Sequence, residues 1–432
     1  MKYYSTNRSV PEVSLREAVV RGLAADRGLF MPERIDRLPD DFFNVIDKLS
    51  FQDIAVRVAQ AFFGEDVEPK SLEAIVRDTL SFDTPAVEIE KDIYSLELFH
   101  GPTLAFKDVG ARFMARLLQY FINKDSDGRT VNVLVATSGD TGSAVANGFL
   151  GVAGIHVYVL YPGGKVSPIQ ECQFTTLGRN ITAIEVDGNF DDCQRLVKSA
   201  FLDEELNARM LLTSANSINV ARFLPQAFYY FSGYAQLKAM GRDIVICVPS
   251  GNFGNITAGL IAHRMGLPIK RFIAANNAND IFYNYLLSGE YRPKASIPTL
   301  ANAMDVGDPS NFARVLDLYE GKHDVISSLI SGASFSDSRI AEAMNECFAK
   351  TGYVLDPHGA CGYLALKEQL KEGETGLFLE TAHPAKFRDT VSGIIGTEVD
   401  IPVRLGEFMK GEKKAVAMTA RFSDFKSYLL DR

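Results

Sequence analysis

The spacing of apolar residues changes near Val131 and divides the chain into two kinds of segment. Before Val131, three runs show the helical period, and Ser14 and Glu17 precede the first run at the spacing of a capping box: LREAVVRGLAA, FQDIAVRVAQAFFG and SLEAIVRDTL. After it, short β-branched runs are followed by glycine-bearing loops and helical segments: VNVLVA, HVYVLYP, DIVICVP and RFIAAN. This alternation indicates parallel sheets covered by helices, and therefore an α/β fold.

The alternation lapses between Asn276 and Asp337, where prolines and glycine favour long surface connections, and it resumes with a helix that ends at Gly352. A chain of 432 residues exceeds what one hydrophobic core usually organises. We expect a helical extension over residues 1–90, an α/β region with a reactive lysine over 91–240, and a larger α/β region over 241–432.

Composition and charge exclude several classes of protein. The chain is 47% hydrophobic and 23% charged, with a net charge of −9 and scattered basic residues, which argues against nucleic acid or an anionic membrane as the partner. No run approaches the roughly 18 apolar residues of a membrane span, and the N-terminus lacks the apolar centre of a signal peptide. The five cysteines lack metal-ligand spacing, so we expect free thiols, a cytoplasmic protein and no metal.

Two glycine loops each lie between a strand and a helix. In PSGNFGNITAG, Gly251 and Gly254 are expected to let several backbone N–H groups converge at a helix N-terminus, which is an anion-binding arrangement. The alternative for this loop is a tight turn in which Asn252 and Asn255 cap the helix. The second loop, ATSGDTGSA at 136–144, has the same construction.

Lys107 lies in HGPTLAFKD, where a loop is expected to become a helix. A lysine at a helix start is ordinarily solvated. Beside two anion-binding loops, however, an amine nucleophile is what a pyridoxal phosphate enzyme acting on an amino acid requires. The lysine would hold the cofactor aldehyde as a Schiff base, and the loops would hold the cofactor phosphate and the substrate carboxylate.

Over nearly its whole length the chain resembles the threonine synthase family, in the longer form with an N-terminal extension, among the tryptophan synthase β-like (fold type II) pyridoxal phosphate enzymes. The resemblance rests on VSLREAVVRGLAADRGLFMPE, LELFHGPTLAFKD, ATSGDTGSA, TSANSINVARFLPQ, VPSGNFGNITAG, DPSNF, DPHGACGY and ETAHPAKF. It implies two parallel-sheet, three-layer domains around a central active-site cleft, plus the helical extension.

The resemblance also implies roles for individual residues. Lys107 would bind pyridoxal 5'-phosphate and then move protons at the substrate's α and β carbons, and Thr381 would face the pyridine nitrogen. The cofactor phosphate would be bound by Gly251, Asn252, Phe253, Gly254 and Asn255. The substrate carboxylate would be bound by Ser138, Gly139, Thr141 and Gly142, and the substrate phosphate by Ser217 and Arg222. A structural ion pair is the alternative for Arg222, and a plain strand-end hydroxyl is the alternative for Thr381.

Three further residues stay open. Asp140 stands where many relatives have an asparagine that bonds the cofactor's 3′ oxygen, so its carboxylate either points elsewhere or has a raised pKa. His100 and His383 flank the lysine and threonine motifs, and each could line the pocket or be structural.

The reaction implied is the conversion of O-phospho-L-homoserine and water to L-threonine and phosphate, by γ-elimination and β-hydration, as the last step of threonine biosynthesis. Such an enzyme is a carbon–oxygen lyase with a small-molecule substrate, and we expect a monomer or small homo-oligomer. Two alternatives are a serine/threonine dehydratase or other β-replacing fold type II enzyme, and a non-catalytic protein that binds the cofactor or a phosphorylated ligand. The NSINVAR motif speaks against the dehydratase, which needs no substrate-phosphate site.

Overall fold

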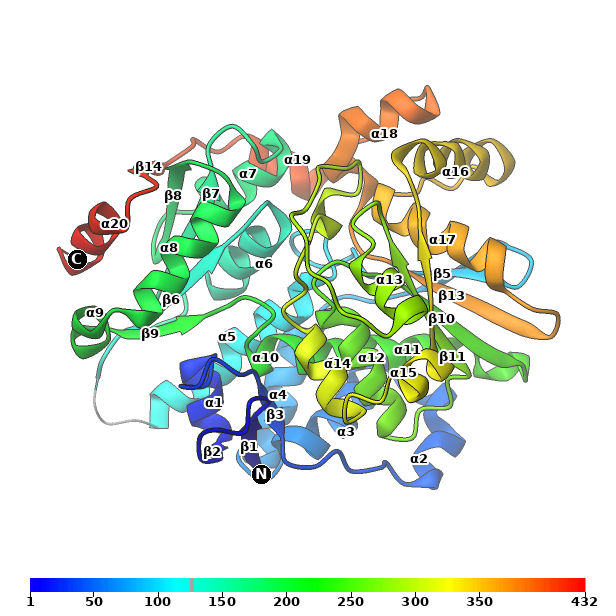
Figure 1. The fold of residues 1–432 in the computed structure, drawn as a ribbon, viewed down its shortest axis with the longest axis horizontal. Helices are drawn as coiled ribbons and strands as arrows, with labels where there is room; N and C mark the ends of the chain where they lie inside the picture. The colour runs from blue at the N-terminus through cyan, green and yellow to red at the C-terminus, as the bar shows by residue number, and fades with distance from the viewer. Residues whose placement is uncertain (125–127, 432) are drawn as a thin grey trace. The chain divides into compact units, whose positions relative to one another are not determined.

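The computed structural model describes residues 1–124 and 128–431 and contains two packing units (Figure 1). Unit 1 comprises residues 1–31, 107–222 and 401–432, and unit 2 comprises residues 32–106 and 223–400. Both units are discontinuous and cut across the three consecutive ranges expected from the sequence, 1–90, 91–240 and 241–432. The reason is strand pairing, because strands from near both ends of the chain join sheets that are formed mainly by later or earlier segments.

Unit 1 is built on a parallel sheet of five strands in the order β14-β8-β7-β6-β9. The strands are β6 Val131–Ala136, β7 Ile155–Pro162, β8 Ile181–Asp187, β9 Leu211–Ser214 and β14 Ala415–Thr419. A small sheet, β2-β1-β3, is formed by β1 Lys2–Ser5, β2 Val13–Ser14 and β3 Phe30–Pro32. The helices are α1 Leu15–Arg21, α5 Lys107–Lys124, α6 Asp140–Phe149, α7 Pro168–Thr175, α8 Phe190–Leu202, α9 Glu204–Arg209, α10 Val220–Phe223, α19 Val403–Met409 and α20 Phe422–Leu430.

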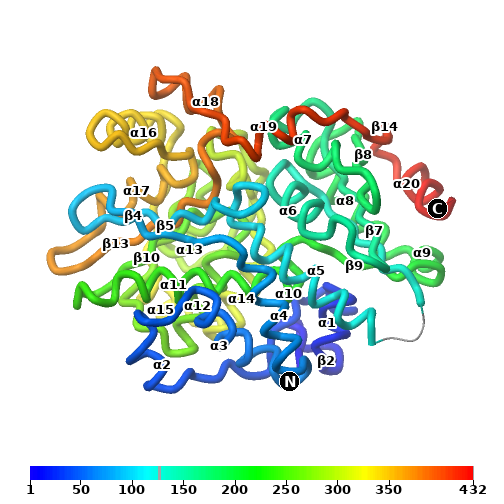
Figure 2. Tube along the Cα trace, turned by 180° about the vertical axis from the view of Figure 1, so that it is seen from behind, coloured from blue at the N-terminus to red at the C-terminus, as the bar shows by residue number. Residues whose placement is uncertain are grey.

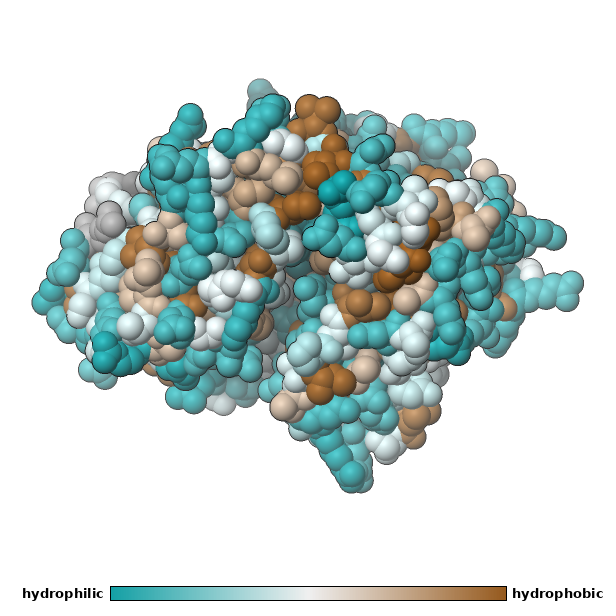
Figure 3. Space-filling view, turned by 90° about the horizontal axis from the view of Figure 1, so that it is seen from above, coloured by the Kyte–Doolittle hydropathy of each residue, from teal (hydrophilic) through white to brown (hydrophobic). Residues whose placement is uncertain are grey.

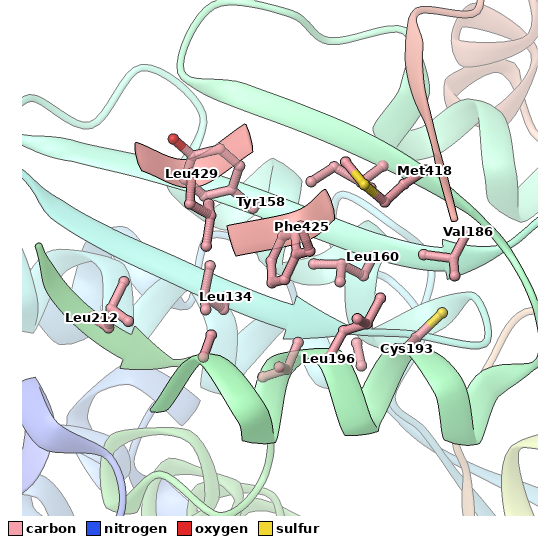
Figure 4. Close-up of a cluster of buried hydrophobic side chains, with 14 of the residues drawn as sticks. Leu134, Tyr158, Leu160, Val186, Cys193, Leu196, Leu212, Met418, Phe425 and Leu429 are labelled. Carbon is pink, nitrogen blue, oxygen red and sulfur yellow. The ribbon is translucent and has the colours of Figure 1, made fainter. Parts of the chain in front are cut away.

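The core of unit 1 explains why the last thirty residues belong to it. Alternate side chains of β6, β7 and β8 point to one face of the sheet, as the two-residue period of a strand requires. On that face Leu134 and Leu160 pack with Leu196 of α8 and Phe425 of α20 (Figure 4). The C-terminal helix therefore completes a hydrophobic layer that begins near residue 131.

Unit 2 is built on a sheet of six strands in the order β12-β11-β10-β13-β5-β4, in which only the edge strand β4 is antiparallel. The strands are β4 Ala86–Glu90, β5 Ile93–Glu97, β10 Asp243–Pro249, β11 Arg271–Asn276, β12 Ile330–Ser334 and β13 Glu374–Glu380. The α-helices are α2 Asp40–Val45, α3 Phe51–Phe63, α4 Pro69–Thr79, α11 Ala227–Leu237, α12 Gly254–Arg264, α13 Ile281–Ser288, α14 Phe312–Leu318, α15 His323–Leu329, α16 Asp337–Thr351, α17 Pro357–Gln369 and α18 Arg388–Ile395. Short 3-10 turns are η1 Ile46–Lys48, η2 Leu224–Gln226, η3 Lys238–Met240, η4 Asn302–Met304 and η5 Pro384–Phe387.

Helices cover both faces of the sheet in unit 2. Gly233 of α11 lies against Leu377 of β13, whereas Gly362 of α17 lies against the next residue, Phe378. Figure 2 shows α16 beside α17 on the second of these faces. Because helices cover both faces, β13 is buried at every position rather than at alternate ones, as is typical of parallel strands between helical layers.

The helices and strands expected from the sequence are present, with two additions. Ser14 accepts a hydrogen bond from the Glu17 N–H over 3.2 Å, while the Glu17 carboxylate pairs with Arg21. The N-terminal segment is less purely helical than expected, since β1 to β3 form a sheet there. The segment 276–337 contains three α-helices and the edge strand β12, which its prolines and short apolar runs concealed.

The surface contains both hydrophilic and hydrophobic residues. On the face in Figure 3, hydrophilic residues predominate and hydrophobic residues lie among them. Within the described ranges, no helix combines the length and the apolar character needed to cross a membrane.

Candidate active site

Three motifs meet at one edge of the sheet in unit 2. Strands β10, β13 and β5 are parallel neighbours, so their carboxyl ends lie at the same edge. The first leads into the glycine loop at 250–254, the second into Thr381, and the third into the loop 98–106 that Lys107 directly follows. Ligands of α/β proteins bind at this edge of a parallel sheet, which makes it the candidate site.

The loop before Lys107 is joined to the segment after β13. The Phe106 N–H donates to the Thr381 carbonyl over 2.9 Å, and Ala105 and Ala382 form an antiparallel bridge. The Tyr229 hydroxyl donates to the Phe106 carbonyl over 2.6 Å. Helix α5 begins at Lys107, as the sequence predicted, so the lysine follows a backbone position that is fixed against Thr381.

The glycine loop differs in detail from the expectation. The left-handed position is Phe253, with φ of 64°, and neither Gly251 nor Gly254 has a positive φ. Gly251 is needed instead for close approach, because a Cβ there would lie 2.8 Å from the Cα of Met304. The non-glycine residue in the αL region gives the loop its turn into α12.

The capping alternative for this loop is wrong, since in the described structure no side chain caps α12. The Asn252 Oδ1 accepts from the Ser310 N–H over 2.7 Å, and the Asn255 Oδ1 accepts from the Tyr230 hydroxyl over 2.9 Å. The Asn255 Nδ2 is buried without a hydrogen-bond partner among the described residues. A buried donor beside uncapped helix amides fits a phosphate group, which supplies the missing acceptors.

The second glycine loop, in unit 1, is shaped by Thr137, a residue that the sequence reasoning missed. Its hydroxyl accepts the N–H groups of Gly139, over 2.9 Å, and Gly142, over 2.8 Å. Gly139 has φ of 145°, which only glycine adopts readily. Ser138 in this loop is exposed, and Thr141 is half-buried. The hydroxyl in the first position of TSGDTG was the only sequence signal for Thr137.

The NSINVAR segment follows β9, the parallel neighbour of β6, and so lies beside this loop within unit 1. The Asn216 Nδ2 donates to the Ala136 carbonyl over 3.1 Å and joins the two segments. Ser217 is half-buried. Arg222 is 2% exposed, and its Nη1 donates to the Ala215 carbonyl over 2.7 Å.

Burial lowers the pKa of Arg222 to about 10, and the nearby Asp108 carboxylate opposes that shift. Asp108 is itself buried in the first turn of α5. The contact with Ala215 and the charge of Asp108 agree with the structural alternative for Arg222, so its role toward a ligand stays a proposal.

The three open residues have partners within their own units. The Gln170 Nε2 donates to the Asp140 Oδ1 over 2.8 Å, so that carboxylate oxygen is directed at Gln170. The His100 Nε2 lies 2.7 Å from the Glu97 Oε2. The His383 Nδ1 accepts from the Ala385 N–H over 3.1 Å, and burial followed by the charge of His100 lowers the His383 pKa to about 4.

His383 therefore caps the turn η5 as a neutral ring with its hydrogen on Nε2. No cluster of three or more histidine, cysteine, aspartate or glutamate residues suited to a metal ion occurs in the part of the chain that the structure describes.

Comparisons with known proteins identify the family of this chain. The family model described as "Pyridoxal-phosphate dependent enzyme" matches residues 79–381, and those described as "Threonine synthase N terminus" and "Threonine synthase, C-terminal" match residues 2–80 and 359–429. The chain is 45% identical over 436 residues to a threonine synthase of Serratia marcescens, covering 100% of this chain and 99% of that one.

Two solved structures are similar throughout. The threonine synthase of Escherichia coli superposes with a TM-score of 0.93 at 43% identity, covering 100% of both chains. The PLP-bound threonine synthase of Brucella melitensis also gives a TM-score of 0.93, at 34% identity, covering 99% of this chain and 98% of that one.

Proposed function

This chain belongs to the threonine synthase family of pyridoxal-phosphate dependent enzymes, and from that premise we propose that it converts O-phospho-L-homoserine and water to L-threonine and phosphate. It has the fold type II architecture and acts on a small molecule. The observation that carries the proposal is the sheet edge in unit 2 where the glycine loop, Thr381 and the loop 98–106, which directly precedes Lys107 in the chain, converge.

The residues of unit 2 would bind the cofactor at its phosphate and at its ring nitrogen. Residues 251–255 and the first amides of α12 would bind its phosphate, with the buried Asn255 Nδ2 as a further donor. The Thr381 hydroxyl would face the ring nitrogen, and a hydroxyl, unlike a carboxylate, does not hold that nitrogen protonated. When bound, pyridoxal phosphate supplies an electron sink for negative charge at the substrate carbons.

Lys107 would anchor the cofactor and then serve as the base. The leaving phosphate is on the γ carbon, so protons must leave both the α and the β carbon before elimination. The Lys107 amine sits on a flexible four-carbon chain whose backbone start is fixed through Phe106. One mobile amine on a fixed base can reach two adjacent carbons in turn.

The residues of unit 1 would bind the two anionic groups of the substrate. Ser138 and Thr141 would donate to the carboxylate from the loop that Thr137 shapes, together with Gly139 and Gly142. Ser217 and Arg222 would bind the substrate phosphate, for which a guanidinium is well suited. Arg222 would act from a buried position, where its bond to Ala215 also supports the backbone just before Ser217.

The test is the reaction itself, with a matched lysine control. The purified protein should release phosphate from O-phospho-L-homoserine and form threonine in equal amount. Borohydride should attach the cofactor to the peptide that contains Lys107, and Lys107→Ala should abolish both results. Lys124→Ala, at the opposite end of α5, should behave as the wild type. A wild-type protein that takes up no pyridoxal phosphate would contradict the proposal.

The dehydratase alternative predicts a different substrate preference. An enzyme of that kind would deaminate L-serine or L-threonine faster than it releases phosphate from O-phospho-L-homoserine. We expect the opposite order because Ser217 and Arg222 would bind a substrate phosphate that L-serine and L-threonine lack. We also expect the protein in a reducing, cytoplasmic compartment, which its five free cysteines support.

A further inference from the structure

Three titratable side chains are buried together near the start of α17: Asp356 and His358 of the DPHGACGY motif, which the reaction leaves without a role, and Glu380 at the end of β13. Asp356 and Glu380 are fully buried and His358 is 2% exposed. All three belong to unit 2, and Glu380 directly precedes Thr381. Buried groups of this kind are costly unless their hydrogen bonds are satisfied, so their partners show what they hold.

The partners determine the tautomer of His358. The backbone N–H of Ala303 donates to the His358 Nε2 over 3.1 Å, so that nitrogen carries a lone pair rather than a hydrogen. The hydrogen of the neutral ring is then on Nδ1, where it donates to the Asp356 Oδ1.

Asp356 is fixed in turn by its own contacts. Its carboxylate accepts from the His358 and Gly359 N–H groups at the start of α17, and its N–H donates to the Glu380 Oε1 over 2.7 Å. Burial, followed by the charge of Asp356, raises the pKa of Glu380 well above its ordinary value. The raised pKa favours the neutral form of Glu380, and the Asp356 carboxylate is the group that contacts the His358 Nδ1.

The turn η4, whose Ala303 N–H donates to His358, is in close contact with the glycine loop. Ala303 belongs to η4, and a Cβ on Gly251 would lie 2.8 Å from the Met304 Cα and 2.9 Å from the Ala303 carbonyl oxygen. The loop and the turn are therefore in backbone contact, without a side chain between them. A movement of η4 at Ala303 would therefore displace Gly251 as well.

We infer that His358, oriented by Asp356, is a positioning residue for the cofactor-phosphate loop. The inference rests on the proposed role of residues 251–255. It adds two residues, His358 and Asp356, that fix the position of that loop. The reversed tautomer would place a hydrogen on Nε2 against the Ala303 N–H, so two donors would face each other. The turn would then shift away from His358 and carry Gly251 out of its place.

Asp356→Asn is the sharpest variant. With its N–H₂ turned toward His358, asparagine keeps its oxygen on the Gly359 N–H but loses the bond from the His358 N–H, which Asp356 accepts through the same Oδ1 that faces the ring. Its amide N–H₂, turned toward His358, favours the reversed tautomer, as replacing the aspartate of a catalytic triad does. His358→Leu removes the acceptor for Ala303, whereas His358→Gln keeps a carbonyl oxygen that accepts from it.

The binding measurement uses the apoprotein with pyridoxal phosphate, pyridoxal and inorganic phosphate. We expect Asp356→Asn and His358→Leu to weaken the binding of pyridoxal phosphate and of phosphate about tenfold to a hundredfold, the loss typical when a residue that orients a metal ligand is replaced. Pyridoxal, which lacks the phosphate, should bind as to the wild type, and His358→Gln should restore most of the loss. His323→Ala, which breaks a bond to the Leu286 carbonyl in the same unit, is the matched control and should leave all three affinities unchanged.

A spectroscopic measurement separates orientation from general damage. In ¹⁵N-histidine-labelled protein, the His358 resonance should show a protonated Nδ1 in the wild type and a protonated Nε2 in Asp356→Asn. Wild-type phosphate affinity in both loss variants, or equal weakening of pyridoxal and pyridoxal phosphate, would overturn the inference. A wild type that binds pyridoxal as tightly as pyridoxal phosphate would instead remove the proposed phosphate site itself, and the inference with it.

Discussion

The backbone N–H of Phe106 donates to the carbonyl oxygen of Thr381 over 2.9 Å. This one hydrogen bond joins the residue before the proposed cofactor-bearing lysine to the residue proposed to face the cofactor ring nitrogen. The two residues are distant in sequence, but β5 and β13 are paired in parallel, so their loops leave the sheet together. The backbone at Phe106, directly before Lys107, is thus set by the sheet of unit 2.

Tyr229→Phe tests how far that fixed backbone matters. The change removes the hydroxyl that donates to the Phe106 carbonyl and should lower the free energy of unfolding by about 1–2 kcal/mol, since a buried acceptor loses its partner. We expect kcat to fall about tenfold with little change in KM, because a poorly placed base slows chemistry more than binding. Urea unfolding and steady-state kinetics measure the two effects. Tyr234→Phe on the same helix is the control, and an equal loss of kcat there would contradict the explanation.

Tyr230 follows Tyr229 in sequence. Tyr230→Phe should weaken the binding of the cofactor phosphate rather than disturb Lys107. The Tyr230 hydroxyl lies 2.9 Å from both the carbonyl oxygen and the Oδ1 of Asn255, and burial raises its pKa well above the ordinary value, so it remains a donor. Without it, Asn255 is free to turn, and we expect about tenfold weaker binding of pyridoxal phosphate to the apoprotein. Borohydride labelling of Lys107 at saturating cofactor should be unchanged. The opposite pattern, with normal affinity and poor labelling, would show that Tyr230 acts on the lysine loop instead.

The sequence predicted the strands and helices around this candidate site better than the conformation of its loops. Strand periods and glycine loops indicated the sheets, and the position of Lys107 at the start of α5 was confirmed. The loop conformation was not predictable, because Phe253 rather than a glycine takes the left-handed position and Gly251 is required by the approach of Met304. Contacts between distant segments, which decide both features, leave no periodic pattern in a single sequence.

Buried polar partners were equally hidden. The pairing of Ala303 with His358 spans 55 positions, and neither residue stands out by type or spacing alone. Thr137 was visible only as the hydroxyl residue of a glycine loop, although its side chain accepts two of the amides on which the loop depends. Side chains that bond to the backbone of another segment are identified by position in space, and the sequence gives only their residue type.

Arg222→Ala distinguishes a ligand-binding role from a structural one. If the guanidinium binds the substrate phosphate, kcat/KM for O-phospho-L-homoserine should fall on the order of 10²-fold, the value of one or two hydrogen bonds to a charged group. The slow turnover of an unphosphorylated amino acid should fall much less. We expect this asymmetry, and Ser217→Ala should show it in weaker form. Equal losses on both substrates, together with a lower free energy of unfolding, would mean that Arg222 has only a structural role, through its contacts with Ala215 and Asp108.

His383→Asn should remove the part of the loss of stability at low pH that is caused by protonation of His383. The His383 pKa is lowered by burial from 6.5 to about 4, so between these values the unfolded chain takes up a proton that the folded protein does not. The stability that the neutral ring contributes is therefore complete above pH 6.5 and is lost as the pH falls toward 4, by up to about 3 kcal/mol. Asparagine keeps an acceptor for the Ala385 N–H but does not titrate. Urea unfolding at several pH values should show the difference between wild type and variant shrinking or reversing across this window, whereas parallel curves would show that the protonation of His383 is not linked to folding.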